Sequence, residues 1–261
     1  MTGPSTAWDP AQYTRFEDER SQPFFELAAL IERRPGRRVV DLGCGTGALT
    51  AWLHRELQAA ETLGLDASDS MLAQASAHAG DGLRFEAGDV RTWAPDRPVD
   101  LLCSNAALQW VDEHEALWPR LASMVAPGGQ LAIQMPMNDD HASHVEARAL
   151  AREEPFRTAL DGFERRFPTL APERYASLLY ALGFERPHVR VQVYGHVLPE
   201  TRSVVEWVKG SLLTPYRERL DAETYALFLE RYTQRLVDRL GEHAPFFYPF
   251  KRVLMWGRLA S

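Results

Sequence analysis

The sequence predicts an α/β fold built around a mostly parallel sheet, and three observations support that prediction. From about residue 37 to residue 135, short apolar runs alternate with helical patterns, as βαβ units require. A glycine-rich loop directly follows the first apolar run, where such units carry a ligand-binding turn. The 261 residues, 45% of them hydrophobic, are enough to bury the core of one elaborated domain spanning 1–261.

The glycine-rich loop covers residues 41–47 and reads DLGCGTG. Its alternate glycines let the backbone turn sharply and present N–H groups to a ligand at the start of the next helix. Gly43, Gly45 and Ala48 satisfy the dinucleotide fingerprint G-x-G-x-x-G/A, and a candidate ribose-binding acid, Asp66, stands about 20 residues further on. An NAD-dependent oxidoreductase is therefore one interpretation of the loop.

Two further acids favour S-adenosylmethionine over a dinucleotide. Asp41 precedes the first glycine, where its carboxylate would repel a pyrophosphate and attract a ligand with an amino group and a sulfonium. Asp89 closes the third apolar run. Hydrogen-bonding capacity then suggests roles: Asp66 can accept from both ribose hydroxyls, and Asp89 can accept from the adenine amino group, with the Val90 backbone beside it.

Three helices are predicted between the first strands. Residues 48–57 carry apolar side chains at helical spacing. Ser68 is placed to cap the second helix. The apolar stripe of this helix should join the core, or it should place Met71 against the adenine ring. Asp112, with Glu115 three residues later, predicts the cap of the third helix.

The pattern changes after Pro136. Residues 137–170 are polar and helical in periodicity, which predicts an inserted cap. A helix opening at Pro172 and a strand over 189–197 resume the main fold. A second helical insertion is predicted over 200–247, followed by a last strand over 251–259. The two insertions are the candidate substrate cap.

Composition argues against several classes of function. The net charge of -7 and the absence of a long Lys/Arg cluster disfavour nucleic-acid binding. No apolar run is long enough to span a membrane and the N-terminus is polar, so we expect a cytoplasmic protein. Cys44 and Cys103 are expected to be reduced thiols. His141 and His144, close to Asp139, lack a third ligand of matching pattern, so no metal is expected.

The order of these features resembles the class I, Rossmann-like methyltransferases. The shared landmarks are the glycine loop, Asp66, Gly88-Asp89-Val90, the run Asp100 to Asn105 and Pro127-Gly128-Gly129. The resemblance implies a mostly parallel seven-stranded sheet with an antiparallel last strand, S-adenosylmethionine as cofactor, and a helical segment over 1–34 that folds across it. The cofactor-binding candidates are Trp8, Tyr13, Arg20, Asp41, Gly43, Gly45, Asp66, Met71, Asp89, Val90 and Asn105, with Arg20 assigned to the cofactor carboxylate by resemblance.

Several shorter runs are similar to methyltransferases that act on trans-aconitate. They are Trp8-Asp9-Pro10, Glu19-Arg20-Ser21, Asn105 to Trp110, Gln134-Met135-Pro136 and Glu206-Trp207-Val208. This similarity implies carboxyl O-methylation of trans-aconitate or a related small polycarboxylate, by a monomer or weak dimer. The substrate-binding candidates are Gln109, Trp110, His141, Arg148, Tyr194, His196, Trp207 and Tyr216.

The chemistry of ester formation agrees with the lack of an obvious catalytic constellation. A carboxylate is already ionised at neutral pH, so it needs no general base to act as a nucleophile. We therefore expect positioning to be the main contribution of the protein, and no residue is assigned as catalytic. Another small acid or an acyl-carrier thioester as acceptor, the oxidoreductase, and a catalytically idle binding module remain alternatives.

Overall fold

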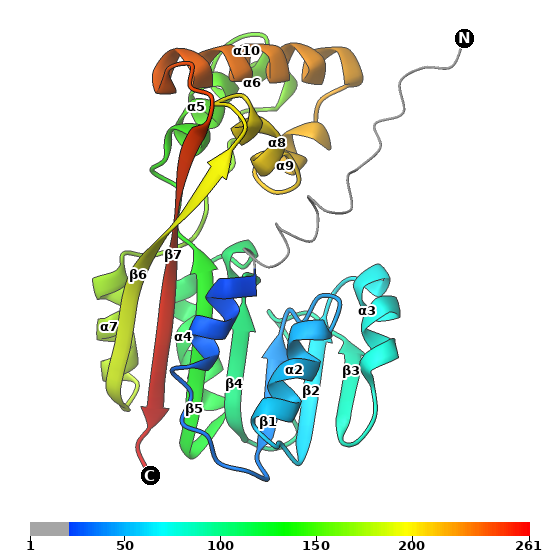
Figure 1. Ribbon diagram of the computed structural model, residues 1–261, viewed down its shortest axis with the longest axis vertical. Helices are drawn as coiled ribbons and strands as arrows, with labels where there is room; N and C mark the ends of the chain where they lie inside the picture. The colour runs from blue at the N-terminus through cyan, green and yellow to red at the C-terminus, as the bar shows by residue number, and fades with distance from the viewer. Residues whose placement is uncertain (1–20) are drawn as a thin grey trace. The chain divides into compact units, whose positions relative to one another are not determined.

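The computed structural model describes residues 21–261, which divide into two compact units (Figure 1). Unit 1 contains the described residues up to Met135, together with Thr169–Val191 and Val253–Ser261. Unit 2 contains Pro136–Pro168 and Gln192–Arg252. The chain therefore leaves unit 1 and returns to it twice.

A seven-stranded sheet has the order β3-β2-β1-β4-β5-β7-β6. Its strands are β1 Arg38–Leu42, β2 Glu61–Asp66, β3 Leu83–Ala87, β4 Val99–Asn105, β5 Val125–Pro136, β6 Phe184–Leu198 and β7 Phe246–Leu259. The pairs among β1 to β5 are parallel, whereas β7 runs in the opposite direction to its neighbours (Figure 1). This confirms the predicted mostly parallel sheet with an antiparallel last strand.

Two strands are longer than their sequence patterns predicted. β6 begins five residues before Val189, and β7 begins at Phe246 instead of Lys251. In β7 the reason is visible in the burial of alternate aromatic residues: Phe246, Tyr248 and Phe250 are buried on one face. That alternation extends the strand into the range assigned to the second insertion.

Unit 1 contains a helix over residues 21–28 and four further α-helices that accompany the sheet. They are α2 Ala48–Glu56, α3 Asp69–Ala75, α4 His114–Ser123 and α7 Pro172–Ala181. Ser68 caps α3 as predicted, since its side chain accepts a hydrogen bond from the Met71 N–H. Pro172 opens α7 at its first turn, again as predicted.

The predicted cap at Asp112 is wrong. α4 begins one residue later than that cap would require, after Glu113, which takes a left-handed conformation with φ of 58°. No side chain caps this helix, because the chain reaches it from a 3-10 turn over Leu108–Trp110 and changes direction at Glu113.

One face of the sheet packs against α2 and the helix of residues 21–28. Phe24 and Leu27 from that helix and Leu53 from α2 share a buried cluster with Leu101 of β4 and Ala132 of β5. Burying such side chains contributes about 2 kcal/mol each. The carboxyl ends of the strands are thereby held on a rigid base.

The opposite face carries α4 and α7. Trp118 and Tyr175 are fully buried with ring centroids 4.8 Å apart. The Tyr175 hydroxyl lies 2.5 Å from His114 Nδ1 and accepts the backbone N–H of Leu170. Burial lowers the pKa of His114, so this histidine is neutral in the core.

Unit 2 contains helices and parts of β6 and β7. Its helices are α5 Ala142–Ala151, α6 Phe156–Ala159, α8 Ser203–Lys209, α9 Thr214–Arg217 and α10 Ala222–Leu240, in agreement with the predicted helical character of both insertions. Its core stacks Tyr216 on Phe228 at 5.0 Å. The Tyr232 hydroxyl of α10 donates to the Ser143 carbonyl of α5, which joins the two longest of these helices.

A buried glutamine joins three segments of unit 1. Gln130 of β5 accepts the Glu32 N–H at 2.8 Å and donates to the Glu32 carbonyl at 3.0 Å. The same side chain accepts the Trp256 indole N–H of β7 at 2.8 Å. One amide thus ties the segment before β1 to two strands.

We predict that Gln130→Leu destabilises the protein by about 2 kcal/mol or more, because buried donors and acceptors lose their partners. A lower midpoint in urea unfolding would show this. Gln22→Leu is the control, since Gln22 is exposed and bonds only Glu26 on the same helix. Equal stability of the two variants would contradict the assigned role.

Candidate functional site

A cavity of about 710 Å³ opens in unit 1 at the carboxyl ends of the parallel strands. The strand order reverses between β1 and β4, and such a reversal is where open α/β sheets bind ligands. The lining residues follow β1, β2, β3 and β4 and are Gly43 to Thr46, Leu49, Asp66 to Ser68, Met71, Gly88 to Arg91, Asn105 to Ala107, Trp110 and Val111. The volume suits a nucleoside-sized ligand.

The glycine loop is fixed by the end of β2. The N–H groups of Gly43 and Cys44 both donate to the Leu65 carbonyl, at 2.7 and 3.0 Å. Gly43 has φ of 78°, and a Cβ at this position would lie 2.2 Å from the Cβ of Ala107. Only glycine fits here, because the loop after β1 and the loop after β4 touch at this point.

Asp66 organises the cavity wall. Its Oδ2 accepts the N–H of Gly45 at 2.9 Å, and its Oδ1 accepts the N–H of Ser68 at 2.9 Å. Each carboxylate oxygen still has a lone pair for a further donor. The predicted contact with two ribose hydroxyls therefore fits the orientation of this side chain in the cavity.

Asp89 also lines the cavity, and Arg91 holds it in place. The Arg91 backbone N–H donates to Asp89 Oδ1 at 2.8 Å, and the guanidinium Nε lies 2.9 Å from each carboxylate oxygen. These bonds lower the pKa of Asp89, which is ionised at neutral pH. An ionised, oriented carboxylate can accept the exocyclic amine of adenine.

Asp41 lies behind the loop, only 3% exposed, and is not part of the cavity wall. Its Oδ2 accepts the Thr50 hydroxyl at 2.6 Å, which ties the end of β1 to α2. Its Oδ1 is buried without a hydrogen-bond partner among the described residues. Burial raises the pKa of Asp41 to about 6, and the nearby Asp66 adds to the rise.

The remaining cofactor candidates divide into two groups. Val90 and Asn105 line the cavity, as does Met71, which is 40% exposed. The expectation that the apolar stripe of its helix is core is therefore wrong for Met71, because the helix is short and that side faces the cavity. Trp8, Tyr13 and Arg20 lie outside the described residues.

Two substrate candidates belong to unit 1. Trp110 lines the cavity and is 46% exposed. Gln109 is buried and donates through Nε2 to the Ala106 carbonyl at 2.6 Å. Ala106 has φ of 54°, an uncommon conformation for a residue with a Cβ. Gln109 thus supports the turn that carries Trp110.

Six substrate candidates belong to unit 2. His141 caps α5 by accepting the Ser143 N–H, and burial lowers its pKa. Arg148 donates to the Asp139 carboxylate at 2.5 Å and to the Asp139 carbonyl at 2.8 Å. These contacts orient the guanidinium of Arg148. A guanidinium has five N–H donors, so further donors can bind an anion.

Three of these six candidates, Tyr194, His196 and Trp207, lie on β6 and α8. His196 lies 4.4 Å from the Trp207 ring, and Tyr194 is buried two residues before His196 on the same face of β6. Tyr216 is fully buried elsewhere in unit 2. Its hydroxyl accepts the Arg165 N–H at 2.9 Å and its ring stacks on Phe228, so we assign it a packing role.

His144 is a buried histidine of α5. Burial lowers its pKa to about 3, so it is neutral, and its Nδ1 lies 3.0 Å from the Ser143 hydroxyl. Within residues 21–261, no group of three or more His, Cys, Asp or Glu side chains is arranged to hold a metal ion.

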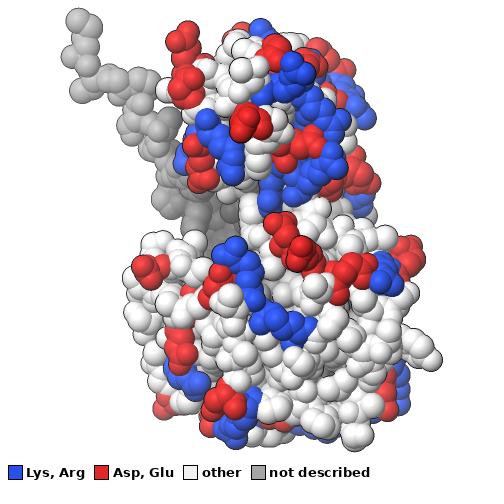
Figure 2. All heavy atoms as spheres, turned by 180° about the vertical axis from the view of Figure 1, so that it is seen from behind, with Lys and Arg blue, Asp and Glu red and all other residues white. Residues whose placement is uncertain are grey.

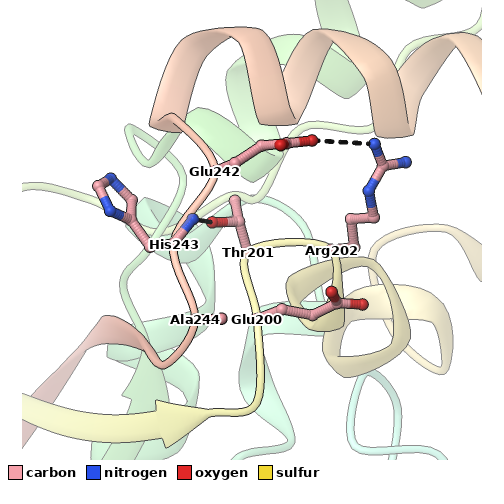
Figure 3. Close-up of a pocket in the computed structure, with 6 residues that line it drawn as sticks. All are labelled: Glu200, Thr201, Arg202, Glu242, His243 and Ala244. Carbon is pink, nitrogen blue, oxygen red and sulfur yellow. Dashed lines mark hydrogen bonds and ion pairs between the residues drawn. The ribbon is translucent and has the colours of Figure 1, made fainter.

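A smaller hollow of about 220 Å³ lies on unit 2 between the turn after β6 and the turn after α10 (Figure 3). Thr201 joins these turns, because its hydroxyl donates to the Gly241 carbonyl and accepts the His243 N–H. Glu242 pairs with Arg202, and the His243 ring points away from that pair. With Glu200 also present, the hollow does not suit a polyanion.

The sequence patterns did not reveal three supporting residues of the cavity in unit 1. Arg91, Thr50 and Ala107 act through contacts with Asp89, Asp41 and Gly43 that only the folded backbone creates. Because Arg91 follows Asp89 by only two residues, the spacing in the sequence alone allows an ion pair between them. Ala107 gives no local signal.

Fold, glycine loop and strand-end acids together define a class I, Rossmann-like methyltransferase. Residues 39–129 match the family model described as a methyltransferase domain. The trans-aconitate 2-methyltransferase of Deinococcus radiodurans is 46% identical over 95% of this chain and 96% of its own length. That of Mycobacterium tuberculosis is 37% identical, over 95% of each chain. The chain belongs to the trans-aconitate 2-methyltransferase family.

Solved structures agree on the fold. The YcgJ protein from Bacillus subtilis matches with a TM-score of 0.60 at 16% identity, over 94% of this chain and 99% of that one. A phosphoethanolamine N-methyltransferase from Haemonchus contortus, solved with S-adenosyl-L-methionine, matches with a TM-score of 0.55 at 15% identity, over 92% of this chain and 53% of that one. Family membership decides against the NAD-dependent oxidoreductase.

We predict that Gly45→Ala weakens cofactor binding at least tenfold. Gly45 lines the cavity with φ of 56°, and a Cβ there meets no atom of residues 21–261 within 4 Å, so the methyl group would take up ligand space. Calorimetric titration with S-adenosylhomocysteine measures the change. Gly36→Ala is the matched control, because Gly36 has φ of 77°, is equally uncrowded and lies outside the cavity.

Both variants pay the same backbone penalty of roughly 1 kcal/mol for a left-handed alanine, so their stabilities should match. Only Gly45→Ala should lose affinity. Equal affinities of the two variants would contradict the placement of the ligand against this loop.

We predict that affinity for S-adenosylmethionine rises with pH through about pH 6, the raised pKa of Asp41. A cationic ligand favours the ionised carboxylate, so it binds more tightly once the carboxyl has lost its proton. The stability of the ligand-free protein changes with pH in the opposite direction. Its folded-state pKa exceeds the unfolded value, so the free energy of unfolding falls between about pH 4 and pH 6.

Calorimetric dissociation constants from pH 5 to pH 8 measure the effect. In Asp41→Asn the pH dependence of affinity around pH 6 should largely disappear. An unchanged slope in that variant would assign the titration to another group.

Proposed function

We propose that this protein transfers a methyl group from S-adenosylmethionine to one carboxylate of trans-aconitate, giving a monomethyl ester. The observation that supports this acceptor most strongly is the similarity to trans-aconitate 2-methyltransferases over almost the whole chain, including the helical unit 2. The cavity in unit 1 supports the cofactor, because its acids and glycine loop fit the donors and the cationic end of that molecule.

Each part of the cavity has a proposed role in cofactor binding. Asp66 accepts the ribose hydroxyls, and Asp89, oriented by Arg91, accepts the adenine amine. Met71 lies against the adenine ring, and Gly43 and Gly45 allow close approach of the loop to the methionine part. We also include Trp8, Tyr13, Arg20 and Asn105 among the cofactor-binding residues, on the family resemblance.

The buried Asp41 explains a preference for a cationic ligand. Its burial and its raised pKa mean that an ionised Asp41 is electrostatically unfavourable in the ligand-free site. When bound, S-adenosylmethionine would supply an electrophilic methyl group on a sulfonium. The acceptor carboxylate would form the new C–O bond as the S–CH₃ bond breaks and S-adenosylhomocysteine leaves, without a general base. The protein fixes the two reactants in line.

Recognition of a polycarboxylate requires cations and hydrogen-bond donors. We propose Gln109, Trp110, His141, Arg148, Tyr194, His196 and Trp207 as acceptor-binding residues, all of them from the turn after β4 or from unit 2. Arg148 is the strongest of these for a carboxylate, since Asp139 already orients its planar guanidinium. The helical insertions then act as the substrate cap.

We further propose a cytoplasmic monomer or weak dimer that does not bind nucleic acid. No helix among the described residues has the length and apolar content to cross a membrane. Figure 2 shows Lys and Arg side chains interspersed with Asp and Glu on the face in view. Elsewhere in the described residues, ion pairs such as Arg235 with Glu153 and Arg239 with Glu146 neutralise part of the positive charge of unit 2. Alternating charge of this kind does not form a phosphate-binding surface.

The test is incubation of the purified protein with S-adenosylmethionine and separate acceptors: trans-aconitate, citrate, a monocarboxylic acid and an acyl-carrier thioester. We expect a monomethyl ester from trans-aconitate, identified by mass spectrometry, and much slower turnover of the others. Asp66→Ala is the control for cofactor dependence, and its affinity for S-adenosylhomocysteine should fall at least tenfold.

Turnover of another acid or of the thioester, with no ester from trans-aconitate, would refute the proposed acceptor. Cofactor binding without turnover of any acceptor would identify an idle binding module.

A further inference from the structure

Two glutamines of β5, Gln130 and Gln134, have the same burial but opposite hydrogen bonding. Both are 0% exposed and both lie on the same face of the strand, four residues apart. The amide of Gln130 bonds Glu32 and Trp256. In contrast, neither Nε2 nor Oε1 of Gln134 has a hydrogen-bond partner within residues 21–261.

Such an amide requires an explanation. Leaving a buried donor and a buried acceptor without partners destabilises a fold, and nearly all buried polar groups in proteins are paired. A leucine at this position would fill similar space without that cost. The retained amide therefore points to a state of the protein in which Gln134 is hydrogen-bonded.

The neighbour of Gln134 in the sheet is Asn105, at the carboxyl end of β4. The two residues are paired in the parallel register, and the next N–H, of Ala106, donates to the Gln134 carbonyl at 2.9 Å. Asn105 lines the cavity, yet its Oδ1 is buried and also lacks a partner among the described residues. The Asn105 amide therefore turns its oxygen inward and its NH₂ group toward the cavity.

These amides are complementary. Gln134 has N–H donors without an acceptor, and Asn105 has an oxygen without a donor, on adjacent strands about 4.8 Å apart. We propose that Gln134 is a positioning residue: its Nε2 donates to Asn105 Oδ1 and fixes the Asn105 NH₂ group for binding the reacting carboxylate of the acceptor. This inference rests on the proposed function, because it assigns an anionic acceptor to the cavity. It replaces the cofactor-binding role that the family resemblance gave to the Asn105 side chain with a contact to the acceptor.

A neutral NH₂ donor suits a nucleophilic carboxylate better than a cation does. A guanidinium paired with the reacting oxygens would hold their charge in strong bonds, whereas an amide orients the group with weaker ones. The position also fits an anion, since the donor would have no favourable contact with a sulfonium.

The test begins with Gln134→Leu. We expect a melting temperature equal to or above that of the wild type, since two unsatisfied polar groups are removed. We expect the KM for the carboxylic acid that the wild type methylates to rise roughly 10-fold or more, and the dissociation constant of S-adenosylhomocysteine to change less than 2-fold. Greater stability with weaker acceptor binding is a combination that a structural role would not give.

Gln130→Leu is the matched control, with the same substitution on the same strand face. It should lower the melting temperature and leave the KM for the acceptor unchanged at temperatures where it is folded. A double-mutant cycle with Asn105→Ala tests the route of the effect. In the Asn105→Ala background, Gln134→Leu should have little further effect on KM.

Destabilisation by Gln134→Leu would show that Gln134 already has a structural partner and would overturn the inference. An unchanged KM, additive effects in the cycle, or a loss confined to S-adenosylhomocysteine binding would overturn it as well. If the wild type methylates a different acid from trans-aconitate, the proposed acceptor fails while the effect of Gln134→Leu is still measured on that acid. If no acid is methylated, both proposals fail.

Discussion

The cavity depends on one carboxylate, that of Asp66, which accepts the N–H of Gly45 with one oxygen and the N–H of Ser68 with the other. A single side chain at the end of β2 therefore fixes both the loop after β1 and the first turn of α3. Two backbone N–H groups directed at one carboxylate fix its orientation in the cavity wall. The same group can then meet a ligand in a fixed orientation, because the protein and not the ligand holds it in place.

Near this carboxylate lie two further acids in different surroundings. Asp41 is buried behind the loop with a raised pKa, whereas Asp89 is partly exposed and pairs with Arg91. Such an arrangement lowers the stability of the ligand-free protein and is relieved by a cationic ligand. The apolar cluster beneath it, with Leu53 and Leu101, stabilises the sheet that carries these groups. The apolar cluster therefore stabilises the fold, whereas the buried acid at the strand ends destabilises the ligand-free protein.

Local patterns in the sequence predicted the sheet, the helices and the glycine loop because each depends on nearby residues: apolar periodicity, Ser68 as a cap, Pro172 at a helix start. The cap at Asp112 failed since the chain enters α4 through a left-handed Glu113, and no composition rule signals that turn. Contacts between distant segments were also out of reach. The register of Gln134 beside Asn105 and the ring contact of His196 with Trp207 arise from strand register and helix packing, which a single sequence does not encode locally.

The contact between Gly43 and Ala107 limits how this protein can vary. A Cβ on Gly43 would lie 2.2 Å from that of Ala107, so Gly43 cannot gain a side chain while Ala107 keeps its own. The loops after β1 and β4 thus meet at a glycine and an alanine. Substitution at either residue is acceptable only with a concerted shift of the other loop. Across descendants of this fold, positions 43 and 107 should change together or remain small.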